Sequence, residues 1–307
     1  MSRLTVLAGI ALCSATLTIS AVSANAGPVR VTQPSAQVVR PVMMIPPRVA
    51  PLHYMHTRQT KPIIPDSCCP LTYGGGPVLL KPHMYVVLWN FKAAGDPDKV
   101  GPLLTSFSNA IGGSKWNKID TQYYSQPPKK FVRNPSHEGS VWDDETDPIP
   151  AHPSDSDIRV ETAAAVAHFG FDPNGSYAIV SAFGHDPQGF ISSGWCAYHS
   201  ATSVTGGIAS YTNMPYMPDG GSSCGANIIS PPSDELGVDE GITIVEGHEF
   251  AESVTDPQPF SGWNSSAGEI GDLCVWTNIQ NDLLKNNFTA TMQPLYSNKT
   301  QSCVHHL

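Results

Sequence analysis

The chain has 307 residues, a formal net charge of −9 and only 14% charged residues. Such an acidic, charge-poor chain is unsuited to coating phosphate backbones, which excludes nucleic acid as an expected partner. Beyond the first residues no apolar run approaches the roughly 20 residues needed to cross a bilayer, so we expect no membrane attachment after removal of the leader.

Residues 1–26 have the three parts of a secretory signal peptide. They hold Arg3, the apolar run LTVLAGIALC and the small residues Ala24-Asn25-Ala26. We expect cleavage near Gly27 and a secreted product, extracellular or periplasmic. Six cysteines then remain, an even number typical of disulfides, although their pairing cannot be deduced from the sequence.

Residues 27–72 differ from the rest of the chain in composition and charge. They contain nine prolines, five basic residues and one acid, whereas residues 73–307 contain 11 basic residues and 25 acids. A proline-rich linker is the favoured interpretation. The alternative is a prosegment lying across an acidic groove, with Cys68 or Cys69 reaching a metal site. We expect one folded domain at 73–307.

The patterning of that domain predicts a single layered α/β fold. Two apolar runs rich in β-branched and aromatic residues predict strands at 84–91 and 177–183, and helical spacing predicts helices at 102–111 and 157–170. Residues 184–236 hold eight glycines and five prolines, so we expect long loops there, pinned by Cys196 and Cys224.

The stretch GHEFAESVTDP, residues 247–257, carries the strongest chemical signal. Asp239 and Pro257 bracket a predicted helix over 240–255. His248 and Glu252 are four apart and share one helix face, as in H-E-x-x-H metallopeptidases with glutamate replacing the second histidine. In that scheme Glu249 is the general base.

A third ligand is expected from AGEIGDLC, where Glu269 and Asp272 are three apart. Glu269 is the preferred ligand, and Asp272 is expected either to bind the ion or to accept a hydrogen bond from His248. One imidazole with two carboxylates suits zinc, while manganese or calcium is also compatible with so hard a site. The competing interpretation is a solvated acidic helix face without metal.

Two further histidines lie in the expected loop region. His185 and His199 could each polarise a substrate carbonyl, and His199 is the preferred catalytic candidate because Cys196 is close to it in sequence.

Five segments together resemble the phosphate-induced/Exordium family, in matching order over residues 73–276. They are YGGGPVLLKPHMYVVLWNF, WCAYHS, SYTNMPYMPDGGSSCGAN, GVDEGITIVEGHEFAESVTDP and GWNSSAGEIGDLCVW. The resemblance implies an extracellular protein of that family's fold, whose best-known plant members are linked to growth without a well-defined reaction. It also implies a branch able to bind metal, because the His248-Glu249 pair is present.

These observations lead to two main hypotheses. The first is a secreted metal-dependent hydrolase, most simply a zinc metallopeptidase-like protein acting on a peptide, protein or cell-wall polymer. The second is a non-catalytic extracellular module that binds glycan or protein around a structural ion. In the second, exposed aromatic side chains would stack on sugars, and the candidates are Trp195, Tyr198, Tyr211 and Tyr216.

A third interpretation, in which the cluster holds no metal and its carboxylates pair with lysine or arginine, is disfavoured. Residues 201–284 contain neither lysine nor arginine.

Overall fold

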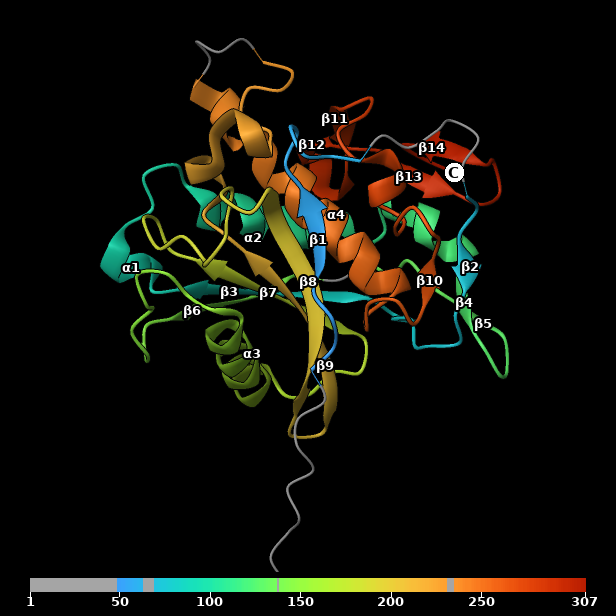
Figure 1. Cartoon of the computed structure of the whole chain (residues 1–307), viewed down its shortest axis with the longest axis horizontal. Coiled ribbons are helices and arrows are strands. Elements are labelled where there is room, and N and C mark those ends of the chain that lie inside the picture. Colours follow the sequence, from blue (N-terminus) through green and yellow to red (C-terminus); the bar gives the residue numbers. More distant parts are fainter. Residues whose placement is uncertain (1–48, 63–68, 137, 231–234) are drawn as a thin grey trace, which may run out of the picture. The chain divides into compact units, whose positions relative to one another are not determined.

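The computed structural model describes residues 49–62, 69–136, 138–230 and 235–307 (Figure 1). All of them belong to one compact unit, Pro46–Leu307. The expected signal segment and Cys68 lie outside the described residues. Within the described part of the chain, no helix is both long and apolar enough to span a membrane.

A six-stranded mixed sheet forms the centre of the unit, in the order β1-β8-β9-β7-β3-β6. Strand β3 runs parallel to both β6 and β7, and β7 runs parallel to β9. The pairs β8–β9 and β1–β8 are antiparallel. The strands span His53–His56 (β1), His83–Trp89 (β3), Ser140–Asp144 (β6), Gly175–Ser181 (β7), Trp195–Val204 (β8) and Gly207–Met214 (β9).

Helices cover both faces of this sheet (Figure 1). Adjacent residues of a strand point to opposite faces. On β8, the Tyr198 hydroxyl donates to Asp155 of one helix, while the ring of His199 faces Glu252 of another. The two helices therefore lie on opposite sides, which confirms the layered α/β fold. The helices are α1 (Phe91–Ala94), α2 (Val100–Ile111), α3 (Asp155–Phe169) and α4 (Glu240–Thr255).

Short elements complete the unit. Four two-stranded sheets pair β2 (Thr72–Tyr73) with β10 (Trp263–Asn264), β4 (Tyr124–Ser125) with β5 (Lys130–Phe131), β11 (Gln280–Leu283) with β12 (Thr289–Met292), and β13 (Leu295–Ser297) with β14 (Ser302–Val304). The 3-10 helices are η1 (Asn117–Gln122), η2 (Met217–Cys224), η3 (Glu235–Asp239), η4 (Asp272–Cys274) and η5 (Lys285–Asn287).

The four elements expected at 84–91, 102–111, 157–170 and 177–183 are confirmed as β3, α2, α3 and β7. The two ends of helix α3 could be predicted because its start and stop signals are local. Ser154 and Asp157 form a capping box at its start, and Gly170 follows its end with φ of 90°.

The expectation of long loops over 184–236 is wrong for its centre, which forms the β8–β9 hairpin. Its glycines are concentrated outside the strands, and Gly206, with φ of 106°, makes the hairpin turn. Disulfides join Cys196 to Cys224 and Cys274 to Cys303, and both are typical of proteins outside a reducing compartment.

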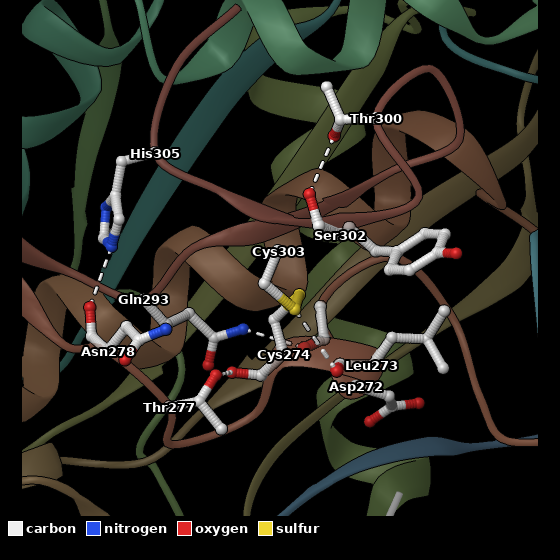
Figure 2. Close-up of a disulfide and its surroundings, with 12 residues drawn as sticks. Asp272, Leu273, Cys274, Thr277, Asn278, Gln293, Thr300, Ser302, Cys303 and His305 are labelled. Atoms are coloured by element: carbon white, nitrogen blue, oxygen red, sulfur yellow. Dashed lines mark hydrogen bonds between the residues drawn. A yellow bond between two sulfur atoms is a disulfide. The ribbon is translucent and has the colours of Figure 1, made fainter. Parts of the chain in front are cut away.

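One boundary expectation also needs correction. Residues 53–56 were expected in a linker but form β1, an edge strand of the central sheet, so the folded unit begins before residue 73. The C-terminal residues also belong to the folded unit. Cys303 is bridged to Cys274 (Figure 2), and His305 Nδ1 lies 2.6 Å from Asp282 Oδ2.

Candidate metal centre

Helix α4 supplies one side of a buried cluster of histidines and carboxylates. It begins after Asp239 and ends at Thr255, two residues before Pro257, as the sequence predicted. Every residue of the helix is buried. The i, i+4 spacing brings His248 Nε2 to 3.1 Å from Glu252 Oε1.

Strand β8 brings His199 to the same point from the sheet. Its Nε2 lies 3.5 Å from Glu252 Oε2 and 3.4 Å from Glu269 Oε2. His199 is fully buried, so it lies among the candidate ligands and not on the wall of an open cleft.

The turn leading into η4 supplies Glu269, and η4 itself begins with Asp272. Asp272 Oδ2 accepts from the Glu269 backbone N–H at 3.1 Å, which fixes the two carboxylates relative to each other. The backbone N–H groups of Gly271 and Asp272 both donate to Glu252 Oε1, at 3.2 and 3.1 Å. One oxygen of Glu252 is thus occupied, and Oε2 is left facing His199.

His53 of β1 is a member of the cluster that the sequence analysis missed. Its Nε2 hydrogen-bonds to Asp272 Oδ2 at 2.6 Å, and its Nδ1 lies 3.5 Å from Glu269 Oε1. A four-residue strand in a proline-rich segment carries too weak a pattern to be recognised. The alternation of buried and exposed residues along HYMH is nevertheless that of a strand.

Gln293 is a second residue that the sequence did not indicate. It hydrogen-bonds to the His248 ring, where Asp272 was the expected partner. Its amide nitrogen lies 2.9 Å from the Gly271 carbonyl oxygen and 3.0 Å from His248 Nδ1. The opposite amide orientation would bring two oxygens together at Gly271. His248 Nδ1 is therefore the acceptor, and the ring proton lies on Nε2, toward Glu252. Asp272 hydrogen-bonds to His53 instead.

Several buried atoms of the cluster have no hydrogen-bond partner among the described residues. They are both ring nitrogens of His199, both carboxylate oxygens of Glu249, both of Glu269, Glu252 Oε2 and His248 Nε2. Unpaired buried polar atoms are rare because each one costs free energy. Their concentration at one point indicates a partner of a different kind.

Protonation balances the charges of the cluster in the absence of an ion. Burial opposes protonation of His53, but the carboxylates of Glu269, Glu252 and Asp272 raise its pKa well above the usual value. Burial would raise the pKa of Asp272, yet the charge of His53 lowers it to about 2. Burial, followed by the charge of His53, lowers the pKa of His199 well below its usual value.

The other two carboxyl groups behave differently. Burial, and then the negative charge of Glu252, raise the pKa of Glu249 well above its usual value. Burial likewise raises the pKa of Glu269, despite the opposing charge of His53. No lysine or arginine forms an ion pair with these groups in the part of the chain described. A divalent cation would supply the charge that protons otherwise supply.

The spacing of the candidate ligand atoms fits a small cation. Three overlapping groups have suitable donors within 4.8 Å of one another, and Glu252 belongs to all three. The groups are His53-Glu252-Glu269, His199-Glu249-Glu252 and His248-Glu252-Asp272. With zinc bonds of about 2.0–2.1 Å, tetrahedral ligand atoms lie about 3.3 Å apart. The separations of 3.4 and 3.5 Å around His199 are close to this value.

Solvent reaches only the edge of the cluster. A cavity of about 260 Å³ is lined by His53, Asp272 and Phe260, among others. His53 and Asp272 are 8% and 6% exposed, whereas His199, Glu249, Glu252 and Glu269 are 0% exposed. The site is therefore closed on all sides but one.

The remaining sequence candidates lie elsewhere. His185 donates through Nδ1 to the Pro150 carbonyl oxygen, outside the cluster. The aromatic side chains that were candidates for stacking on sugars are all buried, namely Trp195, Tyr198, Tyr211 and Tyr216. Their burial removes that argument for glycan binding.

Comparison with protein-family models, curated proteins and solved structures finds no match to this chain. The resemblance to the phosphate-induced/Exordium family stays a prediction.

Proposed function

We propose that the protein binds one divalent metal ion, preferably zinc, and that this site serves metal-dependent hydrolysis of a peptide or related polymer. The ligands are His199 Nε2, Glu252 Oε2 and Glu269. The observation that carries the proposal is the convergence of their unpaired, fully buried donor atoms at separations that suit zinc.

This ligand set changes the part assigned to His248. The spacing within H-E-x-x-E predicts a ligand, but the hydrogen bond from Gln293 to Nδ1 puts the ring proton on Nε2. A protonated nitrogen cannot bind an ion. His248 instead lies against Glu252 Oε1, which also accepts two backbone N–H groups. We propose that it orients Glu252 so that Oε2 faces the ion.

Glu249 is the proposed general base. One of its oxygens lies within 4.8 Å of donor atoms of His199 and Glu252, and neither oxygen has a hydrogen-bond partner among the described residues. A bound divalent ion polarises a carbonyl group and acidifies water. Burial, and then the charge of Glu252, raise the pKa of Glu249, which makes its carboxylate a stronger base than a solvated glutamate.

Burial of the cluster favours a second candidate function. A structural ion occupies a closed site, whereas a catalytic ion needs a coordination position open to water. The complete burial of five of the seven acidic and histidine groups supports a non-catalytic extracellular module stabilised by an ion. We also propose that the protein is secreted and is a distant relative of the phosphate-induced/Exordium family.

Elemental analysis of the purified protein tests the metal site. We expect about one equivalent of zinc in the parent, and loss of zinc in both His199→Ala and Glu252→Ala. Glu249→Gln should keep the metal and lack hydrolytic turnover. A parent that binds no zinc after refolding with the ion would disprove the site, and turnover in Glu249→Gln would disprove only the assignment of the base.

A further inference from the structure

The N-terminal strand β1 brings a fourth donor to the proposed ion. We infer that His53 is a metal ligand, bound through Nδ1 and oriented by Asp272. This inference rests on the proposed metal site and deepens it, because it adds a ligand from a segment far outside the H-E-x-x-E helix.

The register of the sheet places His53 beside His199. In the antiparallel β1–β8 pair these two residues are directly opposite each other. Directly opposed side chains point to the same face of a sheet and approach closely. The two imidazole centroids are 5.4 Å apart, so both rings reach the carboxylates of Glu252 and Glu269.

Hydrogen bonding determines which nitrogen of His53 is free. Nε2 lies 2.6 Å from Asp272 Oδ2, and a carboxylate can only accept, so Nε2 carries a proton. Nδ1 lies 3.5 Å from Glu269 Oε1 and makes no shorter polar contact within the cluster. Metal-bound histidines commonly donate their other N–H to a carboxylate, and Asp272 fills that place.

Adding His53 completes the coordination. His53, His199, Glu252 and Glu269 supply two nitrogen and two oxygen donors, a set that suits tetrahedral zinc. Hydrolysis then requires water to enter as a fifth ligand or in place of His53, which lies at the exposed edge of the cluster. Strand β1 thus closes the centre as well as contributing to it.

Zinc affinity, measured by competition with a chromophoric chelator, tests the inference on the full chain. We expect His53→Ala to weaken zinc binding by at least about 10–100-fold, the loss typical when only a ligand's hydrogen-bond partner is removed. His56→Ala is the control for an exposed residue of the same strand, and it should bind zinc as the parent does.

Two further variants separate ligand loss from damage to the strand. Met55→Ala removes a fully buried side chain of β1 and no donor atom, so it should destabilise the strand and keep the zinc affinity within a few-fold of the parent. In His53→Gln the amide nitrogen can take the position of Nε2 and keep the hydrogen bond to Asp272. No atom is then left at the position of Nδ1 to bind the metal.

We expect His53→Gln to lose as much affinity as His53→Ala, and it takes the place of the alanine variant if that one does not fold. Parental affinity in His53→Gln, or an equal loss in Met55→Ala, would overturn the inference while leaving the ion on His199, Glu252 and Glu269. Absence of zinc from the parent would instead remove the proposed metal site itself.

Discussion

The side chains of His53 and Asp272 form a 2.6 Å hydrogen bond although 219 positions separate them in the sequence. This contact ties the edge strand β1 to the turn that carries Glu269. The pKa of Asp272 is lowered to about 2, so its carboxylate is anionic at neutral pH and accepts the hydrogen bond, while His53 Nε2 donates it. The bond fixes the His53 ring at the candidate metal centre.

Replacing Asp272 with asparagine should weaken zinc binding without removing a proposed ligand. Asparagine keeps the size of the side chain but lowers the basicity of the acceptor, and loss of such a partner typically costs 10–100-fold in metal affinity. Chelator competition measures the change. Asp282→Asn is the matched control, because Asp282 also lies 2.6 Å from a histidine, His305, away from the centre. Equal affinities in the two variants would contradict this role.

Helix α4 could be predicted from the sequence because its signals are local. Asp239, Pro257 and the spacing of His248 and Glu252 lie within one short stretch, and both the bounds and the shared face of that pair are confirmed. Glu269 was also recognised as a neighbour, although no long helix carries it. A turn, held by the hydrogen bond from the Glu269 backbone N–H to Asp272, positions Glu269 instead.

The contribution of β1 could not be predicted for a physical reason. A strand of four residues is stabilised by pairing with β8, which is more than 130 positions away, and not by its own propensity. The surrounding prolines dominate the composition. Gln293 was missed similarly, since nothing in the sequence near an amide side chain shows that it will meet His248.

Removal of His53 should open the proposed ion to water. At zinc concentrations that saturate His53→Ala, we expect faster cleavage of a labelled protein substrate such as casein than by the parent, in which His53 fills a position that water could take. The double variant His53→Ala with Glu249→Gln is the control and should be inactive. Equal cleavage by the single and double variants would show that Glu249 is not the base.

The Cys274–Cys303 disulfide should stabilise both the fold and the metal centre. It fastens η4, whose first residue is Asp272, to β14 (Figure 2). Its sequence separation of 29 residues predicts a loss of roughly 3–4 kcal/mol of unfolding free energy when both cysteines become serine. We expect weaker zinc binding as well, because the turn holding Glu269 and Asp272 would loosen.

The second disulfide is the matched control for that prediction. Cys196 and Cys224 are 28 residues apart, so their replacement by serine should cost about the same unfolding free energy. The backbone of His199 would still be held by the β8–β9 and β1–β8 ladders. Chemical denaturation and chelator competition on both double variants measure the two effects. A larger loss of zinc affinity without the Cys196–Cys224 bond would refute the prediction.

Stability should decrease with rising pH because of Glu161, a buried carboxyl group on α3. Burial, and then the hydrogen bond with Asp144 of β6 and its charge, raise the pKa of Glu161 from 4.5 to about 8. The folded protein therefore keeps a proton that the unfolded chain releases above pH 4.5. The contribution of this group to stability is present below pH 4.5 and is lost as the pH rises toward 8.

Glu161→Gln removes this titration while keeping the shape of the side chain and a donor toward Asp144. We expect the free energy of unfolding of the parent, relative to this variant, to fall with pH by up to about 1.4 kcal/mol per pH unit between pH 4.5 and 8. Urea unfolding across that range measures it, with the exposed Glu145→Gln as control. Parallel curves for the parent and Glu161→Gln would show that Glu161 ionises equally in both states, so that its burial would not govern the pH dependence.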